Sequence, residues 1–253
     1  MSSHTGGYGG YSGGGSHDHK GPHMHKNVIA RNGEDRLPCT FYNKIGACRH
    51  GEKCSRKHIR PLTSFTILLP NLYQNPKLNK NEGEELNPKQ LQQNFDQFFK
   101  DIFVKFATLG EIKELVVCEN ENNHLNGNVY VRFKTKQEAA EATLLLNQEW
   151  FNARPVHCEL SPVSSFPEAN CRAYETSSCT RGDHCNFMHV RHPTQSLVES
   201  LFQSQTKSTL TKKLLQYQEM ADKAEEEKEE HKEEEEKPAT TTVTTSMVQQ
   251  LFA

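Results

Sequence analysis

The chain has 253 residues, of which 34% are hydrophobic and 25% charged, and its formal net charge at pH 7 is -2. This length allows one or two domains of ordinary size. No apolar run approaches the roughly 20 residues needed to cross a bilayer, and the start is rich in Gly, Ser and His, so we expect neither a membrane span nor a secretory leader. In the reducing compartment that this implies, the eight cysteines are better interpreted as thiols or metal ligands than as disulfides.

Both ends of the chain differ in composition from the middle. Residues 1–35 hold more than half of the 15 glycines and five of the 13 histidines. Such a segment buries too little surface to offset its ordering entropy, so we expect a disordered tail whose histidines could bind metal loosely. Between residues 219 and 237, eleven acids and four lysines sum to -7. We expect a helical extension over residues 193–220 and an acidic, disordered tail over residues 221–253.

Two sets of possible metal ligands repeat one spacing. The first set follows C-x8-C-x5-C-x3-H and consists of Cys39, Cys48, Cys54 and His58. The second follows C-x7-C-x5-C-x3-H and consists of Cys171, Cys179, Cys185 and His189. Three thiolates and one imidazole complete a tetrahedral Zn²⁺ shell, and thiolates favour zinc over calcium or magnesium. The sequence therefore predicts two CCCH zinc fingers, finger 1 at residues 37–61 and finger 2 at residues 170–192, each holding one structural zinc ion. Neither shell has an open position for catalysis, and chance cysteines or disulfides explain the repeat less well.

Basic and aromatic side chains are interleaved with these ligands. Side chains around the first set sum to +5, which zinc binding does not require, and those around the second sum to +1. Phe41 and Tyr42 belong to finger 1, and Tyr174 and Phe187 belong to finger 2; each ring either stacks on a base or caps its zinc site. Basic groups with planar rings suit single-stranded nucleic acid, where a stacked base contributes ~1–3 kcal/mol. The predicted RNA-binding residues are Phe41, Lys44, Arg49, Lys53, Ser55, Arg56, Lys57, Arg172, Asn186 and Phe187.

The residues between the fingers, 63–163, follow the order β-α-β-β-α-β. The expected strands are Phe65–Leu69, Ile112–Cys118, Gly127–Phe133 and Val156–Leu160, and the apolar periodicity predicts helices around residues 91–106 and 139–146. This is the order of an RNA-recognition motif, or RRM. The predicted fold class is therefore α+β, with an RRM-like domain flanked by the two fingers.

This middle domain has lost most of the rings with which such a sheet stacks RNA bases. Tyr130 remains, but Leu68 and Asn128 stand at the other two stacking positions. We therefore expect the domain to bind protein rather than RNA. Trp150, the only tryptophan, lies at a turn where the neighbouring Phe151 can serve the core. A lone tryptophan is often buried, but this position favours an exposed one, and exposed tryptophans are frequent binding hot spots.

Finger, degenerate recognition motif and finger, in this order, resemble the small subunit of the U2 snRNP auxiliary factor. The matching segments are residues 41–51, 127–131, 159–163 and 185–189. The resemblance implies a nuclear pre-mRNA splicing factor that is not an enzyme. It also implies contact with the AG at the 3′ splice site and a heterodimer with a large subunit that binds the pyrimidine tract. No membrane and no small-molecule substrate are implied.

The resemblance further implies a peptide pocket in the middle domain. In the family's homology motif, an acidic first helix and an R-x-F sequence clamp a tryptophan-bearing peptide of the large subunit. The partner-binding residues implied here are Asp96, Asp101, Trp150 and Phe151. Glu149 stands where the family has Arg, the first helix also carries lysines, and the C-terminus is acidic instead of rich in Arg-Ser repeats. The electrostatic part of partner binding is therefore expected to differ.

Two other classes of protein fit the sequence less well. A CCCH protein that acts in mRNA processing or turnover outside splice-site selection would have adjacent fingers, whereas a whole domain separates these two. A metal-dependent deaminase would need an H-x-E sequence with P-C-x-x-C, which the chain lacks.

Overall fold

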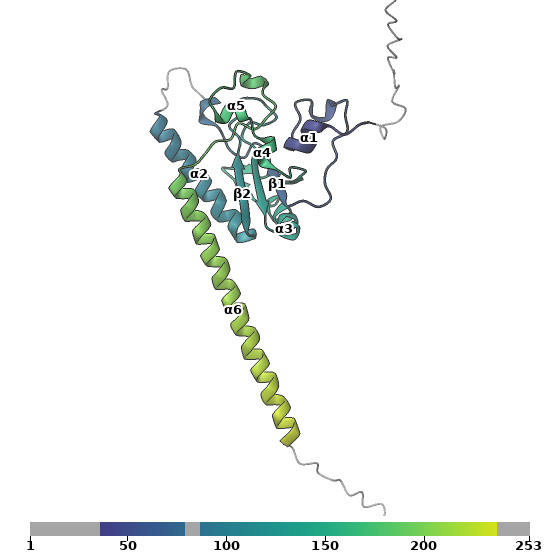
Figure 1. Ribbon diagram of the computed structural model, residues 1–253, viewed down its shortest axis with the longest axis vertical. Helices are drawn as coiled ribbons and strands as arrows, with labels where there is room; N and C mark the ends of the chain where they lie inside the picture. Colours follow the sequence, from purple (N-terminus) through teal and green to yellow (C-terminus); the bar gives the residue numbers. More distant parts are fainter. Residues whose placement is uncertain (1–35, 79–86, 237–253) are drawn as a thin grey trace, which may run out of the picture. The chain divides into compact units, whose positions relative to one another are not determined.

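A four-stranded antiparallel sheet organises the part of the chain that this computed structural model describes, residues 36–78 and 87–236. The strands are β1 (Thr66–Leu69), β2 (Ile112–Val117), β3 (Val129–Phe133) and β6 (Glu159–Ser161), in the order β2-β3-β1-β6 (Figure 1). Two helices, α2 (Pro88–Leu109) and α3 (Lys136–Leu146), cover one face. The predicted βαββαβ order is confirmed. The tails expected at residues 1–35 and 237–253 lie outside the described residues.

Both covering helices begin where the sequence carries capping groups. The Asn87 side chain accepts a hydrogen bond from the backbone N–H of Lys89, and a proline follows at the first helical position of α2. Thr135 and Glu138 form a reciprocal capping box at the start of α3. The side chains of α2 that enter the main core are those of the predicted apolar face, namely Phe95, Phe99, Ile102, Phe103 and Phe106.

The prediction of a strand at Val156–Leu160 is wrong at its beginning. The final strand, β6, starts only at Glu159, and a small hairpin of β4 (Trp150–Phe151) and β5 (Arg154–Pro155) comes before it. The two turn residues of this hairpin, Asn152 and Ala153, have φ angles of 49° and 57°. Two consecutive residues with positive φ give the twist that a two-residue hairpin turn requires, and the unusual alanine there concealed the turn.

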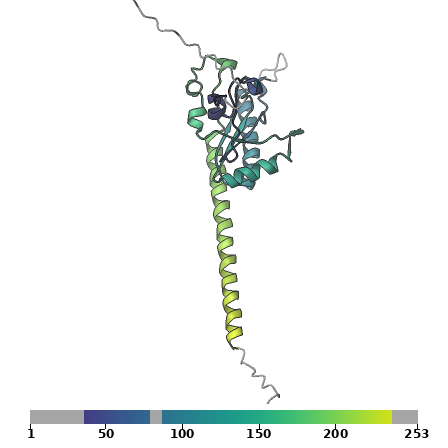
Figure 2. The ribbon, with the colours of Figure 1, turned by 90° about the vertical axis from the view of Figure 1, so that its right-hand side faces the viewer.

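A second hydrophobic core lies on the other face of the sheet. It joins β1, β2 and β3 to finger 1 and finger 2 through Ile45, Leu68, Val116, Cys118, Leu125, Tyr130, Val163, Phe166, Ala169, Met188 and Val190. The short helices of this layer are α1 (Thr40–Ile45), α4 (Phe166–Ala169) and α5 (Arg172–Glu175), with 3-10 turns at Gly51–Lys53, Pro76–Leu78 and Gly182–His184 (Figure 2). The fingers therefore cover the face that helices α2 and α3 leave free.

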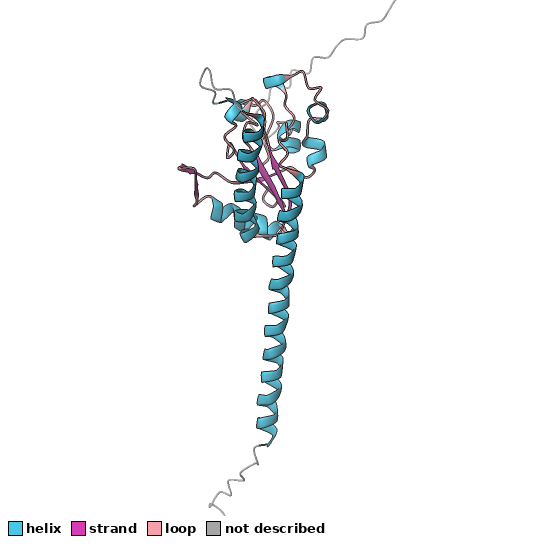
Figure 3. Ribbon diagram, turned by 90° about the vertical axis from the view of Figure 1, so that its left-hand side faces the viewer, coloured by secondary structure: helices cyan, strands magenta, loops and turns pink. Residues whose placement is uncertain are grey.

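The last described element is α6 (Gln195–Glu236), which packs its first turns against α2 (Figure 3). The Phe103 and Phe202 rings lie 5.0 Å apart, and the Gln205 side chain bonds both the N–H and the C=O of Ile112. The expectation of disorder from residue 221 is wrong as far as Glu236. Glu, Lys and Ala are strong helix formers, and Glu219 precedes Lys223 by one turn, so the segment favours a helix despite its charge. None of the described helices is long and apolar enough to span a bilayer.

Candidate zinc centres and the surface between them

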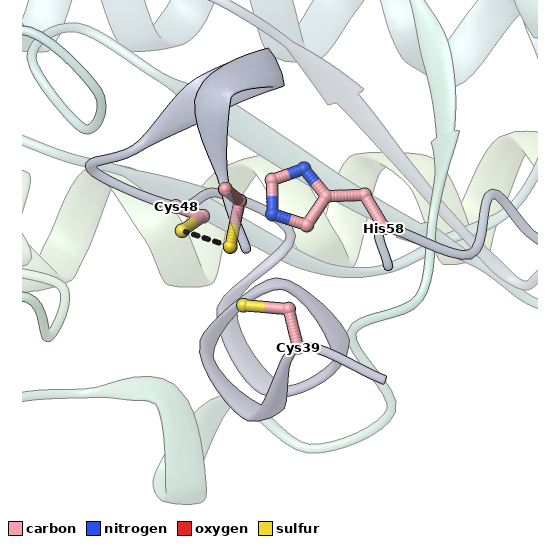
Figure 4. Close-up of side chains that lie close together, drawn as sticks. Cys39, Cys48 and His58 are labelled. Atoms are coloured by element: carbon pink, nitrogen blue, oxygen red, sulfur yellow. Dashed lines mark hydrogen bonds between the residues drawn. The ribbon is translucent and has the colours of Figure 1, made fainter. Parts of the chain in front are cut away.

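The four predicted ligands of finger 1 converge. Their ligand atoms lie within 4.8 Å of one another, and Figure 4 shows Cys39, Cys48 and His58 pointing together. The Sγ atoms of Cys48 and Cys54 are 3.8 Å apart. Zn–S bonds of ~2.3 Å at tetrahedral angles separate two sulfur atoms by ~3.8 Å, so the spacing fits zinc. His58 Nε2 is buried without a hydrogen-bond partner among the described residues, as a metal-binding nitrogen should be.

Finger 2 repeats this arrangement. Cys171 and Cys185 have Sγ atoms 3.7 Å apart, and the Cys179 Sγ lies 3.4 Å from His189 Nε2. All four ligand atoms again lie within 4.8 Å of one another. Both sets are complete Cys3His shells and fit two structural zinc ions.

The ionisation of the ligands is set by their surroundings. Burial raises the pKa of Cys48 and of Cys185 to about 11, so zinc has to displace a proton from each of these thiols at neutral pH. The backbone N–H of Arg181 lowers the pKa of Cys179. Burial lowers the pKa of His189, which keeps its imidazole in the neutral form that binds metal.

One aromatic ring of each finger caps the zinc ligands. Tyr42 stacks on His58 with ring centroids 4.4 Å apart, and Tyr174 stacks on His189 at 3.9 Å. The Tyr174 hydroxyl also donates to Glu119 at 2.6 Å. The two roles that the sequence left open for these rings are thus divided: the tyrosines support the metal sites, and Phe41 and Phe187 are the outward rings, of which Phe41 is exposed and Phe187 is half-buried against the second core.

The outward rings come from different fingers and meet. The Phe41 and Phe187 centroids lie 6.4 Å apart in an edge-to-face arrangement. The Lys44 ammonium lies 5.9 Å from the centre of the Phe187 ring, and the Arg181 guanidinium lies 6.0 Å from it. The surface between the fingers therefore carries two rings and two cations within reach of one ligand.

A cavity of about 510 Å³ opens beside these rings. It is lined by Lys44, Pro167, Glu168, Asn170, Cys171, Arg172, Ala173, Arg181 and Phe187. Three cations and one carboxylate face it, so the cavity is electropositive. A ring beside several cations suits a flat, negatively charged ligand such as a nucleotide.

The end of β2 fixes finger 2 in place. The backbone N–H of Glu119 donates to His189 C=O, and the Asn120 Oδ1 accepts from the His189 N–H, both at 2.8 Å. The Asn122 side chain donates to Cys185 C=O, also at 2.8 Å. Both asparagines are buried, so they serve as hydrogen-bonding supports of the metal site that sequence spacing did not reveal.

The sheet face that carries the three RNA-stacking positions of an RRM is buried in this protein. Leu68, Asn128 and Tyr130 are all buried, and the Tyr130 hydroxyl donates to the Ile45 carbonyl of finger 1 at 2.8 Å. The one ring that survives at these positions therefore holds a finger and is not free to stack on a base.

A smaller cavity, of about 230 Å³, lies on the opposite side of the domain. Its lining residues are Leu69, Leu72, Asp101, Ile102, Lys105, Phe106, Leu146, Glu149, Trp150, Phe151 and Val156. Trp150 is 70% exposed, which confirms the predicted exposure, and Phe151 is half-buried against Phe98. The Lys105 ammonium and the Glu149 carboxylate form an ion pair of 2.9 Å at the rim.

Comparison with known proteins identifies the family. A model of the zinc finger of C-x8-C-x5-C-x3-H type matches residues 34–60 and 166–191, and a model of the RNA recognition motif matches residues 85–157. The U2AF 23 kDa subunit of Schizosaccharomyces pombe, a splicing factor, is 50% identical over 174 residues, which are 69% of this chain and 80% of the relative. The chain belongs to the small-subunit family of the splicing factor U2AF.

Animal relatives give the same result. The human splicing factor U2AF 26 kDa subunit is 44% identical over 174 residues, which are 67% of this chain and 79% of the relative. The Drosophila melanogaster U2af 38 kDa subunit is 44% identical over 176 residues, which are 67% of each chain. The family is one of splicing factors, and the matched CCCH fingers and RRM correspond to the two zinc-ligand sets and the central sheet of this chain.

The structure brings together only some of the predicted RNA-binding residues. Lys44, Arg172 and Phe187 line the electropositive cavity. The others on finger 1 are exposed but do not line it, namely Arg49, Lys53, Ser55, Arg56 and Lys57. Arg181 was missed, although its place four residues before Cys185 and its contact with Phe187 make it part of this surface.

Asp96 is a correction to the predicted partner-binding set. Its carboxylate accepts hydrogen bonds from the backbone N–H and the hydroxyl of Thr194, directly before α6. Asp96 is not among the residues that line the smaller cavity, whereas Asp101 is. The sequence placed both acids on one helix, but they lie five residues apart, on different faces. Asp96 fixes the start of α6.

Proposed function

We propose that this protein contacts the AG of pre-mRNA at the 3′ splice site through both fingers together and binds a large-subunit peptide through its RRM, in the nucleus. The observation that carries the RNA part is the meeting of Phe41 and Phe187 beside the electropositive cavity. A single finger offers one outward ring, which is little surface for specificity, whereas the pair offers two.

Charge and stacking support the same site. Arg172, Arg181 and Lys44 line the cavity and can neutralise phosphates, and the Phe187 ring beside them can stack on a base. The sheet face is buried under the fingers, so single-stranded RNA has no access to it. Recognition of RNA therefore falls to the fingers.

The apolar cavity beside Trp150 supports the partner part of the proposal. An exposed tryptophan next to a small, mostly apolar cavity is the arrangement of an interface hot spot. The rim carries Asp101 and Glu149 against Lys105, so a peptide with a bulky apolar anchor and a basic flank fits it. The tryptophan-bearing peptide of the large subunit, which the family resemblance implies, would supply the apolar anchor.

The RNA part is tested by Phe187→Ala in the zinc-loaded chain. Loss of the ring should weaken binding of an AG-containing RNA by ~1–3 kcal/mol and reduce the preference over an RNA with a mutated dinucleotide. Phe65→Ala is the matched control, because Phe65 is also exposed with a lysine over its ring, 5.4 Å from the Lys136 ammonium, but lies outside the fingers. Equal effects of the two substitutions would contradict the proposal, and binding without AG preference would favour a role outside splice-site selection.

The partner part is tested by Trp150→Ala. Capture of a tryptophan-bearing large-subunit peptide should weaken by roughly 2 kcal/mol or more, as for a hot spot, while RNA binding persists. Leu144→Ala is the control, because Leu144 is equally exposed, at 70%, but does not line the cavity. Tight binding of RNA that depends on Trp150 would show that the domain has been misassigned.

A further inference from the structure

Helix α6 carries an exposed apolar stripe beyond its contact with the domain. Gln205 makes the last hydrogen bonds from α6 to the sheet among the described residues. Farther along, Leu210, Leu214 and Tyr217 are each more than half exposed. Their spacing of four and three residues places them on one side of the helix. The stripe is therefore exposed apolar surface, on the part of α6 that extends past the domain (Figure 3).

The net charge of the helix changes sign along this stripe. Residues 207–213 carry three lysines and no acid, at Lys207, Lys212 and Lys213, whereas residues 219–225 carry three acids against the single Lys223. Lys207 and Glu225 are 18 residues apart, which is five helical turns at 3.6 residues per turn, so both lie on the same edge of the stripe. A helix with this pattern is complementary to itself when it is turned end for end.

We propose that α6 pairs with the α6 of a second copy of this chain in an antiparallel, two-fold contact centred next to Leu215. One register then places Leu214 opposite Tyr217 of the second copy, Leu210 opposite its Ala221, and Lys207 beside its Glu225. Each of these pairs is symmetric about nearly the same point, as a two-fold interface requires. A parallel pair would instead place Lys207 against Lys207 and Glu225 against Glu225, which is repulsive.

The contact is independent of the RNA and peptide sites. It uses the part of α6 after Gln205, whereas those sites are on the fingers and beside Trp150. Its effect is to join two complete splicing-factor subunits, each with its own RNA surface, through a short helical contact.

The pairing is tested by the mass of the full, zinc-loaded chain in sedimentation velocity, from low to hundreds of micromolar. The wild type should show a concentration-dependent dimer, and Leu214→Glu should abolish it because it buries a charge in the stripe. Leu215→Glu should leave it intact, since Leu215 is also half exposed, at 53%, but lies about 100° around the helix from Leu214 and farther from the stripe. Circular dichroism of both variants checks that α6 stays helical.

A charge exchange tests the antiparallel register. Lys207→Glu and Glu225→Lys should each raise the dimer dissociation constant by roughly fivefold to tenfold, and the double variant should restore it, because both pairs become attractive again. A monomer at every concentration would overturn the proposal, as would a dimer that tolerates Leu214→Glu or a double variant without rescue. A stripe that becomes covered only when the large subunit is present would belong to that partner, which would also overturn the proposal.

Discussion

Among single residues, Tyr130 has a structural role at a position where RRM sheets usually bind RNA. Tyr130 occupies a position that stacks on bases in RNA-binding sheets, yet it is buried and its hydroxyl holds the Ile45 carbonyl. In the fingers, Tyr42 and Tyr174 stack on the zinc-binding histidines, whereas Phe41 and Phe187 meet between the fingers. The two tyrosines, each three residues after the first cysteine of its set, therefore have the same task.

Tyr130→Phe should destabilise the chain without creating RNA binding by the sheet. It removes the donor and leaves the buried Ile45 carbonyl unpaired, at a cost of ~1–3 kcal/mol. Denaturant unfolding of the zinc-loaded protein measures the loss. Tyr217→Phe is the control, because Tyr217 is 68% exposed and should have almost no effect. Equal stability of the two variants would show that the hydrogen bond contributes nothing.

Cys48→Ser should remove the zinc ion of finger 1 only. Zinc binding in such modules contributes on the order of 10 kcal/mol, so the finger should unfold locally, and metal analysis should fall from two zinc ions per chain to one. Cys158→Ala is the control, because Cys158 is a buried thiol outside both ligand sets and should keep both ions. Two ions bound to Cys48→Ser would contradict the ligand assignment.

Zinc retention by finger 2 should decrease as the pH is lowered, because acid protonates the ligands. Burial lowers the pKa of His189 below its ordinary value of 6.5 in the folded chain. Its neutral form therefore contributes stability above that pH, and the contribution is lost as the pH falls below it. Protonation of the thiolates acts in the same direction. Zinc release to a coloured chelator between pH 7 and pH 4 measures the effect, and constant retention over this range would contradict it.

At the scale of elements, the end of α1 determines how finger 1 meets the sheet. Gly46 ends this helix with a φ of 75°, and a Cβ at this position would lie 2.6 Å from Ser161 Oγ of β6 and 3.2 Å from the Tyr130 ring. Only glycine combines that backbone conformation with so close an approach. The finger is thus docked through a backbone contact that any side chain would obstruct.

Gly46→Ala and Gly51→Ala separate the cost of the positive φ angle from the cost of the clash with Ser161. Both glycines have positive φ, so each substitution costs ~1–2 kcal/mol in backbone strain. No atom lies within 4 Å of a Cβ at Gly51, so only Gly46→Ala adds the clash and should be the more destabilising. Unfolding free energies of the two variants decide this, and equal values would mean that Ser161 moves aside freely.

At the scale of the whole molecule, the fingers are part of the fold and not appendages to it. Met188 and Val190 of finger 2 are buried in the same core as Ile45 of finger 1 and Tyr130 of the sheet. Deleting residues 170–192 would open this core, so the proposed RNA surface of the two fingers has to be tested by substitutions. Phe187 lines the cavity, and further basic side chains of finger 1 are exposed outside it.

Lys53→Gln should weaken binding of all single-stranded RNAs alike. Lys53 is exposed outside the cavity, so it should contribute through phosphate charge, and its loss should reduce the slope of log affinity against log salt by about 1. Phe187→Ala should leave this slope nearly unchanged, because stacking does not release counterions. Measurements of affinity over a range of salt concentrations distinguish the two, and a base-dependent effect of Lys53→Gln would place this residue at a base instead.

Features that depend on neighbouring residues could be predicted from the sequence. The ligand spacing placed both zinc sites, the periodicity predicted the apolar face of α2, and the order of elements identified the RRM. Three contacts became visible only in the fold: Phe41 meets Phe187, Tyr130 is buried under finger 1, and Asp96 accepts hydrogen bonds from Thr194 and does not line the smaller cavity. These contacts join residues about 85 to 150 positions apart. Local pattern fixes which groups are present, whereas packing between distant segments decides which of them remain free to bind.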